Sequence, residues 1–393
     1  MNSIILDKEL NWKTRISLRV NTVPHGGHYL AEELTNLGFP IHKIRRSSVE
    51  TMGSLEDCIL LNLSLRMAFN VMAEIGSTEA KTLEEVIKYL NLIPWENFLT
   101  AQFPITVTSD SKHEEIRNSM YLNKCVKDAI CDRMRKKIGE RPDSGSHRDG
   151  VVINVSWFDN HIKLWIDTSG KKLTDRGYRK APHPAPLREG VAAMILYATD
   201  WNPSLPLLVP MCGSGTIAIE AALMARNRAP GLLRDHYGYK FLKNYSPNMH
   251  QDVRLKLKKS KPLSDNLFIA ASDINEDAVR ATRQNMTTAG TEHFIELNCS
   301  NICDVKPPDK PGVTIIHPEY GARLGNRDKL VDTYINIGKW IKSLGEGWVA
   351  WVLSGDSELS RHLNLKSTKK IPFRNGPIDC RLIRYDVRPT NFN

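Results

Sequence analysis

The stretch Leu207-Leu-Val-Pro-Met-Cys-Gly-Ser-Gly-Thr-Ile-Ala-Ile-Glu-Ala-Ala222 decides the fold of this chain. An apolar run ends at Pro210, a glycine-bearing turn follows, and strong helix formers begin at Ile217, which predicts a strand, a tight turn and a helix. Gly213 and Gly215 carry no Cβ atom, so the backbone of this turn can pass close to a ligand. Free N–H groups at the helix start favour a nucleotide-like ligand at the carboxyl end of the strand. A tight strand–helix connection that binds no ligand can have the same glycine spacing, so the spacing alone does not decide between the two.

The composition is that of a soluble globular protein with an excess of positive charge. The chain has 393 residues, enough for two or three domains, of which 41% are hydrophobic and 25% charged. The net charge of +10 indicates either simple solubility or a polyanionic partner such as a nucleic acid.

Signals for membranes, export and metals are weak. No apolar run can span a bilayer and no signal-peptide pattern stands at the N-terminus, so we expect a cytoplasmic protein, or one of an organelle matrix in a eukaryote, without a membrane partner. The seven cysteines are scattered, which favours a reducing compartment. Cys299 and Cys303 lie close in sequence, but no second Cys or His pair stands at metal spacing. We therefore interpret them as packed thiols and predict no metal site.

The pattern of the first 167 residues predicts a mixture of strands and helices. We predict strand, helix and strand over residues 15–45 and a helix over residues 60–73. A helix at residues 83–89, a strand at 103–108 and a hairpin of strands 151–155 and 162–167 follow.

The predicted helix at residues 123–138 is amphipathic, with apolar residues at every fourth position. Basic residues occupy its other faces, and we treat five of them as candidate RNA contacts: Lys127, Arg133, Arg135, Lys136 and Lys137. A solvated helix face explains the same pattern equally well.

After the glycine-bearing turn, strands and helices alternate to the C-terminus, which predicts an α/β fold with a doubly wound, Rossmann-like sheet. A strand at residues 267–272 ends at Asp273, whose carboxylate can accept hydrogen bonds from both hydroxyls of a ribose or cap the next helix. We expect strands 205–209 and 313–316 to be parallel neighbours. Asn375-Gly376 predicts a hairpin turn.

Several motifs resemble those of one known family. They are Pro210-Met-Cys-Gly-Ser-Gly-Thr216 with Ile219-Glu-Ala-Ala222, Asn62-Leu-Ser-Leu-Arg-Met-Ala68, Asp167-Thr-Ser-Gly170, Arg176-Gly-Tyr-Arg179, and Ala185-Pro-Leu-Arg-Glu189. On these motifs the chain resembles S-adenosylmethionine-dependent RNA methyltransferases that carry a THUMP domain, in particular bacterial enzymes that methylate N2 of a guanine in 23S ribosomal RNA. The resemblance covers nearly the whole chain. It implies a ferredoxin-like element at residues 1–49, a THUMP-like RNA-binding domain at 50–167, a linker at 168–184 and a Rossmann-like methyltransferase domain at 185–393.

The resemblance also implies a cofactor, a partner and functional residues. The cofactor is S-adenosylmethionine, and the partner is RNA, as ribosomal RNA or a pre-ribosomal particle. The implied cofactor-binding residues are Pro210, Cys212, Gly213, Gly215, Thr216, Asp273 and Asp304, the last of them near the adenine amino group. The implied catalytic residues are His317, Pro318, Glu319 and Tyr320, where the family has Asn-Pro-Pro-Tyr. In that pattern the asparagine oxygen and a proline carbonyl accept the two hydrogens of the substrate amine, and the tyrosine stacks on the base.

Two departures from the family pattern fall in the chemistry. Val209 holds the place of an acidic residue that helps to hold the amino group of the cofactor, and a valine accepts no hydrogen bond. His317 replaces the asparagine and Glu319 the second proline. Only a neutral imidazole can accept a hydrogen bond.

Two hypotheses therefore stay open: an active ribosomal RNA methyltransferase with a modified site, and a degenerate relative that binds ribosomal RNA or a ribosome precursor without methylating it. A DNA amine methylase shares the motif around His317 but not the THUMP-like half. A dinucleotide oxidoreductase is disfavoured, because Ala218 takes the place of the third glycine of Gly-x-Gly-x-x-Gly.

Overall fold

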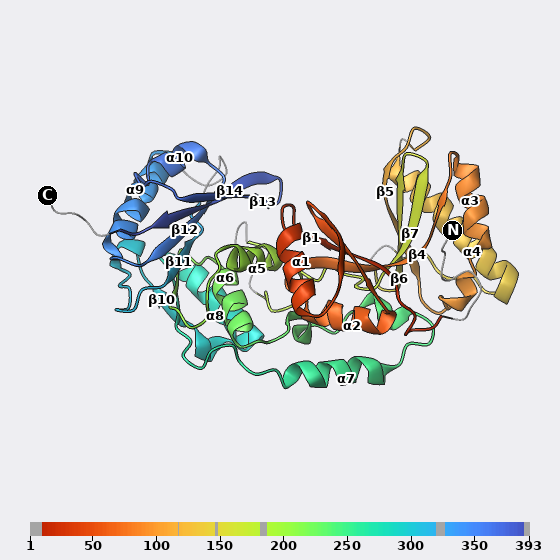
Figure 1. Ribbon diagram of the computed structural model, residues 1–393, viewed down its shortest axis with the longest axis horizontal. Coiled ribbons are helices and arrows are strands. Elements are labelled where there is room, and N and C mark those ends of the chain that lie inside the picture. The colour runs from red at the N-terminus through yellow and green to blue at the C-terminus, as the bar shows by residue number, and fades with distance from the viewer. Residues whose placement is uncertain (1–9, 117, 146–147, 181–186, 320–326, 389–393) are drawn as a thin grey trace. The chain divides into compact units, whose positions relative to one another are not determined.

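The chain divides into two compact units, shown as a computed structural model in Figure 1. The structure describes residues 10–116, 118–145, 148–180, 187–319 and 327–388. The N-terminal unit comprises Met1–Thr22, Leu30–Leu173 and Arg234–Leu257, and the C-terminal unit comprises Val23–Tyr29, Thr174–Leu233 and Lys258–Asn393.

The N-terminal unit is built on one seven-stranded sheet. Its strands are β1 (Ile16–Thr22), β2 (Ile41–Arg45), β3 (Ser48–Gly53), β4 (Ala68–Glu79), β5 (Ile105–Lys112), β6 (Val151–Phe158) and β7 (His161–Asp167). They lie in the order β2-β3-β1-β4-β7-β6-β5, antiparallel except for the parallel pair of β5 and β6. Residues alternate between a buried and a half-buried face along β1, as a sheet with one core-facing side requires.

The helices in the first half of the chain are α1 (Gly27–Asn36), α2 (Leu55–Ser64), α3 (Leu83–Leu92), the 3-10 turn η1 (Trp95–Asn97) and α4 (Ser119–Ile138). Strands β1 to β4 with α1 and α2 follow each other as β-α-β-β-α-β, a ferredoxin-like order that extends to Glu79. The predicted hairpin of β6 and β7 is confirmed.

The helix predicted over residues 60–73 is wrong in its second half. Helix α2 ends at Ser64, where Leu65 takes an extended conformation, and β4 begins at Ala68. Strand β4 pairs with β1 on one side and with β7 on the other. Two ladders of hydrogen bonds thus outweigh the local helix preference of Met72 and Ala73. Strand preference depends on cross-strand neighbours, which cannot be read from the sequence of one segment.

The segment Arg234–Leu257 belongs to the N-terminal unit, although it comes between two strands of the other sheet. It contains the 3-10 turn η3 (Gly238–Phe241) and helix α7 (Pro247–Lys258), whose last residue falls to the other unit. Tyr237 and Tyr239 stack with ring centroids 5.2 Å apart and lie in the buried core. The backbone N–H of Tyr239 donates to the carbonyl of Thr168 at 2.8 Å, and that of Lys243 to the carbonyl of Phe98 at 2.9 Å. The core of this unit is therefore completed from a distant part of the sequence.

The C-terminal unit contains the second seven-stranded sheet. Its strands are β8 (Leu207–Pro210), β9 (Ile269–Asp273), β10 (Glu296–Cys299), β11 (Val313–Ile316), β12 (Val349–Ser354), β13 (Lys369–Asn375) and β14 (Ile378–Asp386). The order is β10-β9-β8-β11-β12-β14-β13; the first five strands are parallel and β14 is antiparallel to both of its neighbours. The predicted parallel pairing of β8 with β11 and the predicted hairpin at Asn375 and Gly376 are confirmed.

The helical elements of this unit are α5 (Glu189–Ala198), α6 (Thr216–Ala225), η2 (Pro230–Leu233), α8 (Glu276–Ala289), η4 (Glu292–Phe294), η5 (Ile302–Asp304), α9 (Arg327–Ser343) and α10 (Ser357–Arg361). The chain runs from β8 outward to β10, returns to β11 and continues to the other edge. Strand order reverses between β8 and β11, and their carboxyl ends are where an open α/β sheet places its ligand.

No helix among the described residues is long and apolar enough to cross a membrane. Within the same residues, no three His, Cys, Asp or Glu side chains gather where they could hold a metal ion. Cys299 and Cys303 are exposed, so their interpretation as packed thiols is wrong. Cys299 is the last residue of the short strand β10, and Cys303 lies in η5.

Candidate cofactor and substrate site

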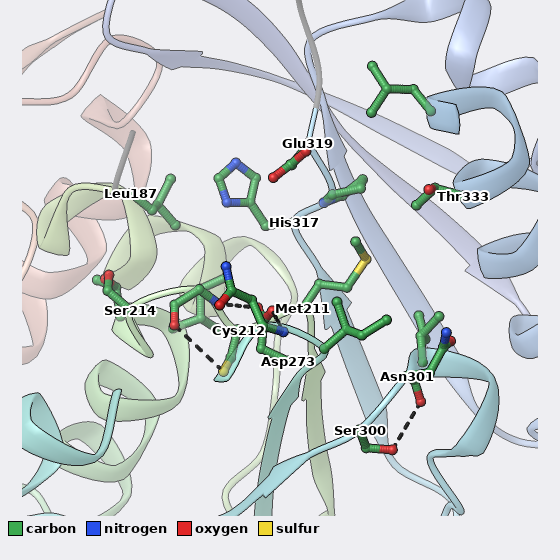
Figure 2. A pocket seen from close by; sticks show the side chains of 18 of the residues that line it. Leu187, Met211, Cys212, Ser214, Asp273, Ser300, Asn301, His317, Glu319 and Thr333 are labelled. Atoms are coloured by element: carbon green, nitrogen blue, oxygen red, sulfur yellow. Dashed lines mark hydrogen bonds between the residues drawn. The ribbon is translucent and has the colours of Figure 1, made fainter. Parts of the chain in front are cut away.

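A cavity of about 860 Å³ opens at the carboxyl ends of the parallel strands (Figure 2). The turn after β8 and the ends of β9, β10 and β11 line it, together with α9 and the tip of the β13–β14 hairpin. Its volume lies within the range of cofactor and ligand pockets.

The turn after β8 is shaped by three residues with positive φ angles: Met211 at 62°, Gly213 at 56° and Gly215 at 78°. A Cβ atom at Gly215 would lie 2.6 Å from Cγ2 of Thr282, so this glycine allows α6 and α8 to approach each other. A Cβ atom at Gly213 would meet nothing within 4 Å. Gly213 lines the cavity and Gly215 does not. The two glycines predicted as cofactor contacts thus have different functions: Gly213 leaves space for a ligand, and Gly215 leaves space for the protein.

Asp273, at the end of β9, fixes the same turn. Its Oδ2 accepts a 2.9 Å hydrogen bond from the backbone N–H of Gly213, and its Oδ1 accepts one of 3.0 Å from Asn275. Thr282 of α8 donates to the carbonyl of Gly213 at 2.7 Å. Each oxygen of Asp273 keeps a further lone pair, and Asp273 lines the cavity, so its carboxylate can still accept hydrogen bonds from a ligand.

Helix α6 begins at this turn without a side-chain cap, because its N-cap is Gly215. Its first N–H groups therefore have no side-chain acceptor, which makes the helix start attractive to electron-rich groups. Thr216 lines the cavity, and so does Leu187. A guanidinium nitrogen of Arg179 donates to the carbonyl of Leu187 at 2.7 Å and to the hydroxyl of Thr216 at 3.3 Å. Arg179 thus ties two parts of the cavity wall together.

The segment that leads to this wall is held by a buried ion pair. Arg176 is 3.4 Å from Glu220 of α6, and both side chains are fully buried. Tyr178 donates a hydrogen bond of 3.2 Å to the same carboxylate, and Arg179 pairs with Glu189 at 3.3 Å. Burial raises the pKa of Glu189. Residues that the sequence singled out only by resemblance thus hold the wall of the cavity through buried ion pairs and a hydrogen bond.

At the end of β10, Ser300 and Asn301 line the cavity, and Asp304 does not. Asp304 is exposed at the end of η5. The Asn301 side-chain oxygen accepts from the N–H of Cys303 at 3.0 Å, which leaves its amide NH₂ available as a donor. The structure therefore places Asn301 at the cavity wall, where Asp304 was predicted. Asn301 lies two residues after the end of β10, and this strand end was the signal that could have identified Asn301.

His317, Pro318 and Glu319 follow β11 and all line the cavity. In Figure 2, His317 and Glu319 lie above the turn formed by Met211 and Cys212. His317 is partly buried, and burial lowers its pKa to about 4. Its ring is therefore neutral at pH 7 and can accept one hydrogen bond. Tyr320, the fourth predicted catalytic residue, lies outside the described residues, as do residues 181–186 of the linker motifs.

Two further positions of this turn, Val209 and Pro210, do not reach the cavity wall, whereas Cys212 does. Val209 and Pro210 are buried in β8 and are not lining residues. Cys212 lines the cavity, and burial raises the pKa of its thiol to about 12, so it is not a thiolate nucleophile. The missing acid at Val209 thus leaves no gap in the wall of this cavity.

The five basic residues predicted as RNA contacts on α4 are in different environments. Arg133 is largely buried and pairs with Glu96 through bonds of 2.8 and 3.0 Å, and it also donates to the carbonyl of Asn91. Lys127 is half-buried, whereas Arg135, Lys136 and Lys137 are exposed. Arg133 therefore joins α4 to η1 and the end of α3, and only the last three side chains form an open basic surface.

Comparisons with known proteins agree with this geometry. The sequence matches the family described as "RMKL-like, methyltransferase domain" over residues 176–384, more than half of the chain, and the THUMP domain family over residues 80–167. It is 28% identical to the "Putative RNA methyltransferase slr0064" of Synechocystis sp. over 91% of this chain and 93% of the relative.

It is also 31% identical to the "Ribosomal RNA large subunit methyltransferase K/L" of Allochromatium vinosum, over 94% of this chain and 51% of the relative. The chain thus spans about half the length of the K/L proteins it matches. Among solved structures, a "putative methyltransferase complexed with SAH" superposes with a TM-score of 0.87 at 26% identity, over 96% of this chain and 100% of that one.

Proposed function

Because the chain belongs to the RMKL-like methyltransferase family, we propose that it transfers a methyl group from S-adenosylmethionine to an exocyclic guanine N2 amine of large-subunit ribosomal RNA. The THUMP match over residues 80–167 and the name of the K/L relatives support RNA of the large subunit as the substrate. The observation that carries the proposal is the meeting of Gly213, Asp273 and His317 around one cavity.

The cavity fits S-adenosylmethionine. Gly213 faces open space that a side chain would fill, the N-terminus of α6 is uncapped, and Asp273 presents a carboxylate for the ribose hydroxyls. Asn301 offers an amide donor to the adenine ring. When bound, the cofactor supplies a methyl group on a positively charged sulfur.

The residues after β11 would prepare the substrate amine. The lone pair of an exocyclic guanine nitrogen is delocalised into the ring, so the amine needs acceptors for its hydrogens. A neutral nitrogen of His317 accepts one of them, and the carbonyl oxygen of Pro318 accepts the other. As the new N–C bond formed and the methyl–sulfur bond of the cofactor broke, one of these two protons would leave the nitrogen for water, relayed by the exposed carboxylate of Glu319.

Transfer of labelled methyl from S-adenosylmethionine to unmodified 23S ribosomal RNA tests the proposal, with the modified nucleoside identified by mass spectrometry. We expect N2-methylguanosine with the wild type and none with Gly213→Asp, whose carboxylate enters the cavity. Methylation at another base or another atom would overturn the assignment of the amine.

The second hypothesis, a relative that binds ribosomal RNA or a pre-ribosomal particle without methylating it, is favoured by one observation: His317 and Glu319 stand where the family has asparagine and proline. The variant His317→Asn with Glu319→Pro separates the two. Methylation that appears only in this variant would show that the wild type binds without transfer. Val209→Asp is not part of this test, because Val209 is buried in β8 and away from the cavity wall.

A further inference from the structure

The β13–β14 hairpin presents two different faces. Ile371 and Phe373 of β13 are paired with Leu382 and Cys380 of β14, and all four side chains are buried. The opposite face carries Lys370 and Pro372 of β13 and Arg381 of β14, which are exposed. Arg374 lies on the same face and is exposed as well.

The tip of this hairpin belongs to the wall of the cavity. Asn375 and Ile378, on either side of the turn, line the cavity together with His317. Arg374 is the residue before Asn375, and Arg381 lies opposite Pro372 in the register. A positive surface therefore begins at the cavity and extends along the hairpin away from it.

The three cations on this surface keep their charge for a ligand, although the Arg381 guanidinium also donates a 3.1 Å hydrogen bond to the carbonyl of Cys380. Among the described residues, none of Lys370, Arg374 and Arg381 forms an ion pair, whereas Arg384 on the other face pairs with Asp386 at 2.8 Å. Asp379, opposite Arg374, is the nearest acid in the ladder. Lys370 and Arg374 are four residues apart, about 13 Å along a strand, so the two charges can reach different phosphates of one RNA strand.

We propose that this exposed face of the β13–β14 hairpin binds the sugar–phosphate backbone of single-stranded RNA beside the nucleotide whose base enters the cavity. The role rests on the proposed function, because it takes the cavity to be the place where a target base is held. A base reaches such a cavity only when it is unpaired or turned out of its helix. Its neighbouring phosphates then remain at the rim, where the charges of Lys370, Arg374 and Arg381 lie.

An alternative explanation exists for part of this surface. Strand β13 is the edge of the sheet, and lysine and proline on an edge strand prevent pairing with another chain. Arg381 does not fit that explanation, since it lies on β14, which is paired on both sides. The alternative predicts that charge reversal changes aggregation and leaves RNA affinity unchanged.

The test uses two double variants. The hairpin variant carries Arg374→Glu and Arg381→Glu, and the control variant carries Lys310→Glu and Lys342→Glu. The control pair makes the same change of charge on exposed residues before β11 and at the end of α9, at the amino ends of the strands. A labelled single-stranded RNA 20-mer is titrated by fluorescence anisotropy at several salt concentrations. We expect the hairpin variant to lose at least tenfold in RNA affinity and to lower the slope of log K against log salt by about 1.4, the value for two phosphate contacts to a single strand. The control should behave as the wild type.

Equal losses in the two double variants would overturn the proposal, because only net charge would then matter. Unchanged RNA affinity in the hairpin variant, with or without aggregation, would also overturn it. The variant Arg374→Gln with Arg381→Gln checks the result without new acids and should show the same lower slope with a smaller loss of RNA affinity. Affinity for S-adenosylmethionine, measured by calorimetry, should stay at the wild-type value. A protein that transfers no methyl group but shows the hairpin-dependent slope would contradict the proposed function and support the hairpin as an RNA-binding element.

Discussion

The backbone N–H of Gly213 donates a 2.9 Å hydrogen bond to Oδ2 of Asp273, so the carboxylate that we assign to the cofactor also holds the turn under it. Asp273→Ala should weaken binding of S-adenosylmethionine by about 1.5–3 kcal/mol for each hydrogen bond to a charged group that is lost. Isothermal titration calorimetry would show this as a rise in Kd of at least about tenfold.

The matched control for Asp273 is Asp304, the other carboxylate expected to bind the cofactor. Asp304→Ala should leave the Kd unchanged, because Asp304 is exposed and away from the cavity wall. Asn301→Ala should weaken binding. A loss of affinity in Asp304→Ala with none in Asn301→Ala would place the adenine at Asp304 after all.

Two alanine variants should separate the functions of the two glycines. In Gly215→Ala the new methyl group would lie 2.6 Å from Cγ2 of Thr282 and the residue would keep a positive φ angle of 78°, so we expect the free energy of unfolding to fall by about 2–5 kcal/mol. In Gly213→Ala the methyl group meets no protein atom within 4 Å, so only the positive φ angle costs about 1–2 kcal/mol. Cofactor affinity should fall more in Gly213→Ala than in Gly215→Ala. Denaturant unfolding and calorimetry on both proteins give the comparison, and the reverse order of affinities would contradict it.

The lowered pKa of His317 changes the expected pH dependence. An unperturbed histidine would lose its acceptor nitrogen near pH 6.5, but a pKa of about 4 keeps His317 neutral down to about pH 5. Methyl transfer at saturating substrate should therefore not fall between pH 8 and pH 5 through this residue. A decline near pH 6.5 that disappears in His317→Asn would contradict the buried, neutral imidazole.

The same shift affects stability. The unfolded chain binds a proton at His317 near pH 6.5, and the folded chain binds it only near pH 4, so the neutral residue costs no stability above pH 6.5. Stability is lost as pH falls through 6.5 toward 4. His317→Asn should remove this contribution, and thermal unfolding of both proteins at pH 7 and pH 5 should show a smaller decrease in Tm for the variant. An equal decrease would mean that His317 ionises alike in both states.

Charge reversal on α4 should distinguish a basic surface from an internal ion pair. Arg135→Glu, Lys136→Glu and Lys137→Glu together should reduce RNA affinity and flatten its salt dependence, with little change in stability because all three are exposed. Arg133→Glu alone should instead lower stability, since it places two carboxylates together where Arg133 now pairs with Glu96. Anisotropy titrations and thermal unfolding measure both effects. An unchanged salt slope in the triple variant would identify this end of α4 as a solvated face.

The sequence predicted the features that depend on local pattern. Three features were predictable because the conformational preferences of their residues act over a few positions. They are the turn from Pro210 to Thr216, the parallel strands beside it and the hairpin at Asn375. Strand β4 did not have this property. Met72 and Ala73 suit a helix as well as a strand, and only their partners in β1 and β7 decide between the two.

The site was predictable in outline and less so in detail. Asp273 follows a clear strand and takes the expected place, whereas Asp304 was chosen three residues beyond Asn301, the residue that lines the cavity. The partner of Arg133 lies 37 residues earlier in the chain, so no helical periodicity on α4 could distinguish it from its exposed neighbours. Contacts between distant parts of the sequence thus account for the main errors.

The membership of Arg234–Leu257 in the N-terminal unit has a consequence for how the protein is made. Synthesis proceeds from the N-terminus at about 5–20 residues per second, and the ribosome finishes β7 well before it reaches Tyr237 and Tyr239. Until these two rings arrive, the core that contains them has an open side, and apolar side chains of the first half remain in contact with water. The N-terminal half must therefore wait, several seconds in a living cell, for a part of the chain that is translated after the first strand of the second sheet. A nascent chain arrested between Leu173 and Arg234 would be the form most in need of a chaperone.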